Sequence, residues 1–271
     1  MMRTLFVEET RTLGPVHAKT IGVLLIAGIG ALAVGLVPHA MGADAPTLMA
    51  VTGAAIAFAL PVPIIAIHTL AEYWQTMHGR RGYLTMSLPA RGREVFGAKV
   101  LYLMAAVMVA LVIAVGGLTV VVLVRAWMND VPPADVWDGI LSLLDLIGTA
   151  AAWSIGAVAV VQLLSFLVMW VSVMSIAAQT RWNHLGIGGA VIGMVLVYLV
   201  CQVLFAAAMM LVPLGMDMGT GDLVARSMLP DLLSGVEPTV LGLGFVPVSV
   251  LVSIALAWWA VHALEHHASL R

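Results

Sequence analysis

Long apolar runs without charge dominate the pattern of hydrophobic and polar positions along this chain. Six runs carry no Asp, Glu, Lys or Arg: 20–43, 45–71, 100–124, 146–180, 182–216 and 238–264. Each exceeds the roughly 20 apolar residues that a helix needs to cross the hydrocarbon core of a bilayer. Because lipid cannot satisfy backbone N–H and C=O groups, such runs form helices. The pattern predicts an all-α integral membrane protein with six transmembrane helices.

The predicted architecture is a single transmembrane domain over residues 1–271. Short segments of alternating hydrophobicity, which are typical of a membrane β-barrel, do not occur. The longest connections are a loop at 72–98 and another at 214–238. The expected spans are about 20–40, 48–71, 98–124, 150–179, 184–213 and 239–263.

The first residues predict a separate amphipathic helix. Over residues 2–13 the apolar Met2, Phe6 and Leu13 fall on one helical face. Such a helix lies along a membrane surface. Gly14 and Pro15 follow, and this pair predicts the point where the chain turns into the membrane.

Composition supports lipid as the solvent. Hydrophobic residues make up 62% of the chain and charged residues 10%, against roughly half and a quarter in soluble domains. A soluble core has too little volume to bury so much apolar surface. The chain has one cysteine, Cys201, so an intrachain disulfide is excluded.

The placement of basic residues predicts the orientation. With the N-terminus in the cytoplasm, ten of the 12 Lys and Arg residues fall inside, and only Arg125 and Arg226 fall outside. Basic residues favour the cytoplasmic side of membrane proteins. Both termini are therefore expected in the cytoplasm.

Residues 139–179 would form about 60 Å of helix at 1.5 Å per residue, twice the thickness of the hydrocarbon. Counted back from Arg181, the span needs only residues near 155–179. Asp145 is then expected at the outer interface, in an amphipathic stretch containing "WDGILSLLDL", although a place inside the membrane stays open. The stretch "DLVARSMLPDLLSGV" in the outer loop predicts a short helix.

The sequence shows no pattern that requires an enzyme. "GREVFGAK" resembles a phosphate-binding loop, but Ala98, Lys99 and Val100 follow Gly97 where Lys and then Ser or Thr are needed, so we expect no ATPase site and no cofactor in this chain. His262 and His266 fall on one helical face and are weak candidates for metal ligands, because no third ligand can be assigned. We expect no catalytic residues and no nucleic-acid partner.

The cytoplasmic loop at 72–98 is the strongest functional clue. The stretch "GRRGYLTMSLPARGREVFGAKVL", residues 79–101, holds five of the 12 basic residues. Two explanations fit this charge. Basic residues anchor topology and attract anionic lipid headgroups, or they surround a surface on which another protein docks.

This stretch resembles the loop between the second and third helices of the permease subunits of type-2 ABC exporters. The resemblance rests on Gly79, Tyr83-Leu84, Ser87-Leu88-Pro89, Arg91 and Lys99, and the six-span topology with a surface helix agrees with it. Ala90 departs from the family, in which many members have Ser or Thr at that position.

The resemblance implies a transmembrane permease subunit in a cell membrane, that of a prokaryote, with a second copy or a related chain as partner. A separate cytoplasmic ATPase subunit would hold ATP and Mg. The loop would form a coupling helix that seats in this ATPase. The coupling residues would be Arg80, Arg81, Tyr83, Leu84, Met86, Leu88, Pro89, Arg91 and Arg93.

Two other functions fit the same pattern of spans. One is a noncatalytic membrane scaffold or sensor subunit. The other is a membrane enzyme that acts on lipid, which would need polar groups that converge at one depth. The resemblance favours the exporter, and the transported substrate stays open.

Overall fold

A computed structural model describes residues 1–79, 81–83, 90–179 and 185–266. The chain is mostly helical. In order, its elements are α1 (Met2–Ala40), α2 (Asp44–Ala59), α3 (Pro61–Met77), α5 (Gly92–Met128), α6 (Pro133–Ile147), α7 (Thr149–Ala177), α8 (Ile187–Leu211), β1 (Gly215–Asp217), β2 (Leu223–Val224), α9 (Leu229–Leu233), β3 (Val240–Gly242) and α10 (Phe245–His266).

Six helical segments of the described chain are long and apolar enough to cross a membrane. They are α1, the α2–α3 pair (Asp44–Met77), α5, α7, α8 and α10. The prediction of a helical protein with six membrane spans is confirmed at this level. The three short strands were not predicted.

The chain divides into two compact units, which we describe separately. The first comprises Met1–Tyr73 and Glu94–Leu141, and the second comprises Trp74–Arg93 and Ser142–Arg271.

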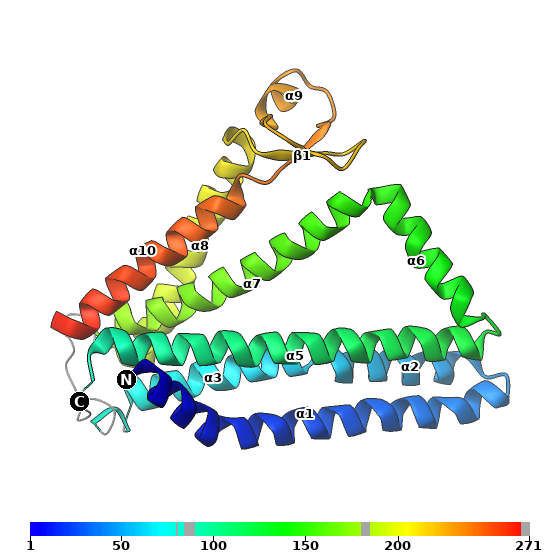
Figure 1. The fold of residues 1–271 in the computed structure, drawn as a ribbon, viewed down its shortest axis with the longest axis horizontal. Coiled ribbons are helices and arrows are strands. Elements are labelled where there is room, and N and C mark those ends of the chain that lie inside the picture. Colours follow the sequence, from blue (N-terminus) through cyan, green and yellow to red (C-terminus); the bar gives the residue numbers. More distant parts are fainter. Residues whose placement is uncertain (80, 84–89, 180–184, 267–271) are drawn as a thin grey trace. The chain divides into compact units, whose positions relative to one another are not determined.

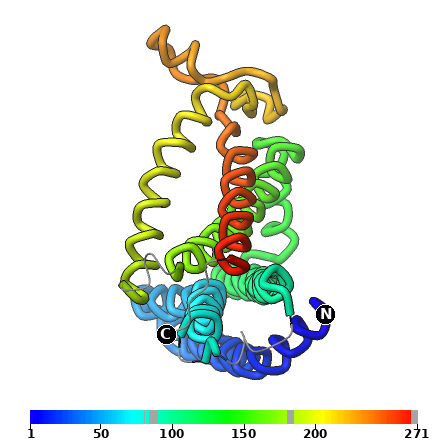
Figure 2. The backbone as a smooth tube through the Cα atoms, turned by 90° about the vertical axis from the view of Figure 1, so that its left-hand side faces the viewer, coloured from blue at the N-terminus to red at the C-terminus, as the bar shows by residue number. Residues whose placement is uncertain are grey.

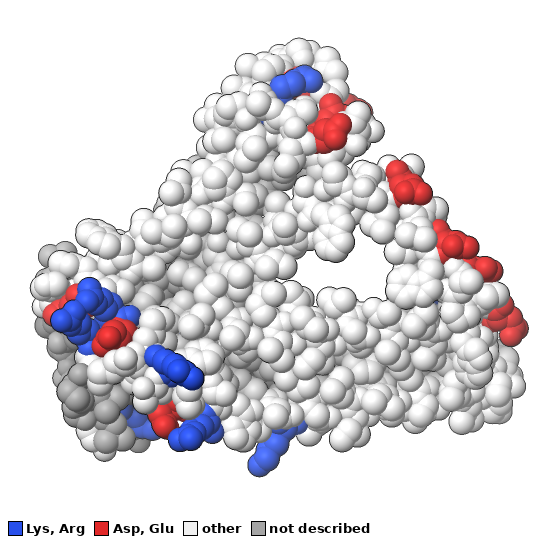
Figure 3. All heavy atoms as spheres, viewed as in Figure 1, with Lys and Arg blue, Asp and Glu red and all other residues white. Residues whose placement is uncertain are grey.

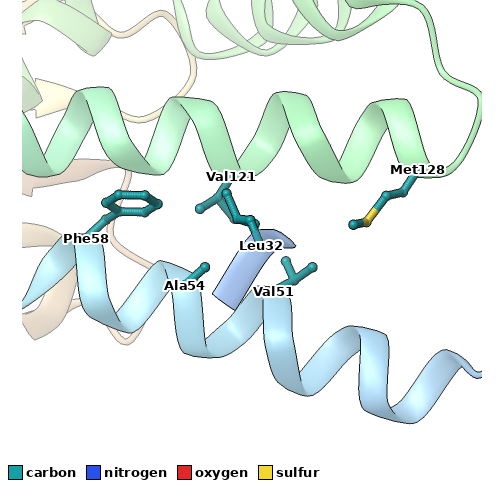
Figure 4. Packing of buried hydrophobic residues seen from close by; sticks show 6 residues of the cluster. All are labelled: Leu32, Val51, Ala54, Phe58, Val121 and Met128. Atoms are coloured by element: carbon teal, nitrogen blue, oxygen red, sulfur yellow. The ribbon is translucent and has the colours of Figure 1, made fainter. Parts of the chain in front are cut away.

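The long helices α1, α2, α3 and α5 make up most of the first unit, where they run side by side (Figure 1). Phe58 of α2 lies at the centre of their packing. A Cβ atom added to Gly117 of α5 would lie 2.5 Å from Phe58 Cγ, and one added to Gly28 of α1 would lie 2.7 Å from Phe58 Cζ. Two glycines therefore make room for one aromatic ring, beside a cluster drawn in Figure 4 that also contains Leu32, Val51, Ala54, Val121 and Met128.

The helix does not end at Gly14-Pro15, since α1 is one helix from Met2 to Ala40 with Pro15 inside it. Proline removes one backbone hydrogen bond. Leu13 and His17 are buried on either side of Pro15, and this packing offsets the loss. The first turns of α1 nevertheless run at an angle to the remainder (Figure 1). Whether they lie on a membrane surface stays a prediction.

The second predicted span is interrupted at Leu60, between α2 and α3. Pro61 and Pro63 follow directly and lack backbone N–H groups, so helical hydrogen bonds are missing there. The N–H of Ile64 still donates to the Leu60 carbonyl at 3.1 Å, which keeps the chain close to a continuous helix.

In the second unit, α10 lies along α7, and α8 contacts both (Figure 2). The Ser249 hydroxyl of α10 donates to Gln162 Oε1 of α7 and joins the two helices. The three strands form a small antiparallel sheet in the order β2–β1–β3. A Cβ atom at Gly242 of β3 would lie only 2.0 Å from the Met209 carbonyl oxygen, so this contact with α8 requires glycine.

Residues 139–179 do not form one helix. The chain breaks between α6 and α7 at Gly148, whose φ is 86°. This positive φ favours glycine. Asp145 belongs to α6, outside the candidate span, and is exposed, as the interpretation of an amphipathic outer stretch expects. The predicted short helix in the outer loop corresponds to α9.

The helices of the first unit contain long stretches without charge. Between Lys19 and Asp44 of the α1–α2 segment, and between Lys99 and Arg125 of α5, no Asp, Glu, Lys or Arg occurs. Figure 3 shows an uncharged stretch on one face of these helices. This distribution fits a bilayer around the uncharged stretches.

Candidate functional site

Four of the nine predicted coupling residues lie in the described part of the chain, and all four are exposed. The side chain of Tyr83 is 60% exposed. The Arg81 guanidinium donates a hydrogen bond to Gln75 Oε1 at 2.7 Å, which ties this end of the loop to α3. Arg91 and Arg93 are exposed at the start of α5. Outside the described residues lie Arg80, Leu84, Met86, Leu88 and Pro89.

A histidine at the start of the loop adds no charge to it at neutral pH. His78 follows the last residue of α3, and its ring lies 5.4 Å from the ring of Trp74. Burial lowers the pKa of His78 to about 4, because a buried imidazolium loses hydration. The positive charge of this segment therefore comes from arginine alone.

The other end of the loop packs against the C-terminal helix. A Cβ atom at Gly92 would lie 3.2 Å from Glu265 Cγ and 3.4 Å from Leu264 Cβ, so α5 begins in close contact with α10. In the same last turns of α10, the rings of His262 and His266 stack at 4.4 Å between centroids. No group of three or more His, Cys, Asp or Glu side chains in the described residues is placed to hold a metal ion.

A polar network joins three helices of the first unit, and its centre is the His17 ring of α1. His17 Nδ1 lies 3.0 Å from the Tyr102 hydroxyl of α5. His17 Nε2 lies 3.2 Å from His68 Nδ1 and 3.4 Å from the Thr69 hydroxyl, both on α3. His17, Thr69 and Tyr102 are all at least 94% buried. One imidazole thus ties α1 to both of the helices that flank the loop in sequence.

A second tie lies close by. The Lys99 ammonium of α5 forms an ion pair with the Glu9 carboxylate of α1, and only 8% of the lysine side chain is exposed. The ring of Phe6 meets the ring of Tyr102 edge to face at 6.2 Å. The first turns of α1 are therefore held to α5 by charge, by an aromatic contact and by the His17 network.

The contacts of this network fix the relative positions of α1, α3 and α5. A displacement of the loop between α3 and α5 would act directly on helices that this network connects.

Sequence reasoning missed His17, Tyr102 and the Glu9–Lys99 pair. The available signal was polar residues near the ends of three apolar runs. The sequence alone does not predict that α1 continues through Pro15. This continuity places Glu9 and His17 on one helix, from which both contact α5.

We compared the chain with known proteins. No protein-family model, no curated protein and no solved structure matches it.

Proposed function

We propose that this chain is the transmembrane permease subunit of an ATP-binding-cassette exporter in the cell membrane of a prokaryote. It pairs with a second permease, identical or related, and each permease engages a separate cytoplasmic ATPase that holds ATP and Mg. The observation that carries the proposal is the segment at 79–93, in which the described arginine and tyrosine side chains are exposed and which is flanked by two candidate membrane spans.

The chemistry of this segment favours a protein partner. Aromatic and arginine side chains are enriched where proteins dock, because they combine a large contact area with directional hydrogen bonds. Tyr83 offers an exposed ring, and Arg81, Arg91 and Arg93 offer charge around it.

ATP binding by the partner supplies the driving force in this proposal. The ATPase must bind two arrangements of the permease with different affinity, since a partner with equal affinity shifts no equilibrium. Movement of the coupling segment reaches α3 and α5, and the His17 network and the Glu9–Lys99 pair carry it to α1. As these helices move together, the substrate path converts from the inward-open to the outward-open state.

Co-purification tests the proposal. We expect the chain, expressed with the ATPase encoded by a neighbouring gene, to co-purify with it and to stimulate ATP hydrolysis. The combined change Arg81→Ala, Tyr83→Ala and Arg91→Ala should abolish both properties. The matched control is Arg125→Ala with Arg226→Ala, two exposed arginines predicted on the opposite side of the membrane.

The expected control complex is indistinguishable from the parent in yield and in ATP hydrolysis. An intact complex with normal stimulated hydrolysis in the triple variant would contradict the coupling assignment. A topology in which the 79–93 segment is labelled by an impermeant reagent from outside the cell would contradict the orientation on which it depends.

A further inference from the structure

A cavity of about 140 Å³ lies between α7 and α8 in the second unit. Aromatic side chains line much of it: Phe166 and Trp170 from α7, and Tyr198 and Phe205 from α8. The rings of Phe166 and Trp170 lie 5.0 Å apart between centroids. Both helices are candidate membrane spans, and the cavity lies along the middle of α8, so it faces apolar surroundings.

The geometry of the two helices explains the cavity. A Cβ atom at Gly193 would lie 3.0 Å from Val173 Cγ1, so α8 approaches α7 closely at this glycine. Beyond that contact the large aromatic side chains keep the helices apart. The close contact at Gly193 and the aromatic rings farther along α7 and α8 leave the cavity between the two helices.

Two polar groups at the cavity lack partners. Within the described part of the chain, neither the Tyr198 hydroxyl nor the Gln202 amide makes a hydrogen bond, although both side chains line the cavity. One helical turn separates them, so they fall on the same face of α8. In hydrocarbon an unsatisfied amide or hydroxyl is costly. A polar group brought by a ligand would remove that cost.

We propose that this cavity binds an amphipathic small molecule through one aromatic or short aliphatic group whose polar substituent bonds Gln202 and Tyr198. Size supports a group of this kind, because an engineered apolar cavity of about 150 Å³ in another protein binds benzene. A transmembrane helix of a second protein is about 10 Å wide and does not fit. An unbranched lipid chain would leave both polar groups without partners. The inference concerns binding and does not depend on the ATPase.

The experiment uses the full chain in lipid nanodiscs and a phenol that carries a photoactivatable diazirine group. After illumination, mass spectrometry locates the label. We expect saturable labelling on the α7 and α8 residues of the cavity, and we expect iodophenol to compete better than iodobenzene. The difference between competitors measures the hydrogen bond, about tenfold in affinity for a bond of about 1.4 kcal/mol.

Three variants sharpen the test. Val197→Phe places a ring in the cavity and should abolish saturable labelling, whereas Val200→Phe, on the lipid-facing side of the same helix, should retain it. Gln202→Leu should remove most of the advantage of iodophenol over iodobenzene. Labelling that does not saturate, or that spreads along the exposed face of α8, would overturn the proposal. In the unmodified chain, equal competition by the two iodinated compounds would overturn the role of the polar pair.

Discussion

In the first unit one imidazole, His17, lies within hydrogen-bonding distance of three side chains on two other helices. In the second unit Tyr198 and Gln202, also within a candidate span, have no partner in the described residues. Both regions accept polar side chains at membrane depth, where such groups bond across helices or mark functional sites. The first unit uses its polar groups to fasten helices, whereas the second leaves two of them directed at a cavity.

The contrast is not a difference in composition, since the second unit also fastens helices with polar groups. The Ser249 hydroxyl of α10 donates a hydrogen bond to Gln162 of α7 and joins these two helices without a charged group. What differs is that, among the residues that the structure describes, no side chain of α8 makes such a bond. We infer that α8 is the helix of the second unit whose packing on α7 is least fixed by polar contacts.

The largest expected effect comes from breaking the Glu9–Lys99 pair. Glu9→Ala removes the carboxylate partner of an ammonium that is 8% exposed, and loss of one partner from a buried pair costs about 3 kcal/mol of the free energy of unfolding. The matched control is Glu8→Ala, whose pair with Arg11 is largely exposed and contributes about 0.5 kcal/mol or less. Unfolding in mixed micelles measures both variants. Equal destabilisation would mean that the tie between α1 and α5 does not hold the unit together.

The next effect concerns the centre of the polar network. His17→Phe keeps a planar ring but leaves Tyr102 and His68 without their shared partner, and we expect a loss of about 2 kcal/mol in the free energy of unfolding. His39→Phe, at an exposed position of the same helix, is the control. A double-mutant cycle with Tyr102→Phe should give a coupling energy of about 1 kcal/mol. Additive effects would show that the 3.0 Å contact carries no energy.

The sequence predicted the spans well because each is a long apolar run, and the bilayer selects for this property directly. It did not predict that α1 continues through Pro15, and it predicted the start of the fourth span near residue 150 but not the break of the backbone at Gly148. A proline within 14 residues of the start favours a helix boundary locally, but burial of Leu13 and His17 decided the outcome. The sequence around Gly148 is apolar on both sides and shows no boundary, and the positive φ of this glycine separates α6 from α7.

The candidate sites were less predictable than the spans. The loop at 79–93 was visible as charge in an apolar chain. The His17 network and the α7–α8 cavity depend on which faces of separate helices meet, and no local pattern encodes that.

The next prediction concerns the apolar packing around Phe58 in the first unit. Gly117→Ala would place a methyl group 2.5 Å from Phe58 Cγ, an atom near the backbone of α2 that cannot move away easily. We expect a loss of about 1.5 kcal/mol, within the usual range for overpacking. Gly116→Ala, one residue earlier, meets nothing within 4 Å and should be neutral or stabilising. The same unfolding measurement distinguishes them, and equal results would contradict the close contact of α2 with α5.

The smallest effect is expected outside the spans, in the loop of the second unit. Asp231 Oδ2 accepts hydrogen bonds from the Thr239 N–H at 3.0 Å and the Thr239 hydroxyl at 2.9 Å. These bonds, with Arg226 as a weaker contribution, hold the pKa of Asp231 below its ordinary value. Because the folded pKa is the lower one, the stabilisation is complete above the ordinary pKa of about 4 and is lost as the pH falls below it.

Hydrogen exchange measures this local tie between α9 and β3. Asp231→Asn should accelerate exchange of the Thr239 amide at neutral pH, because a neutral amide accepts these hydrogen bonds more weakly than a carboxylate, and should leave the six spans unchanged. Once intrinsic exchange rates are corrected for pH, acidification of the parent chain below pH 4 should approach the same state. Asp222→Asn is the control, because this exposed carboxylate of the same loop makes no bond to Thr239. If acidification altered the spans before the loop, Asp231 would not be the group that responds.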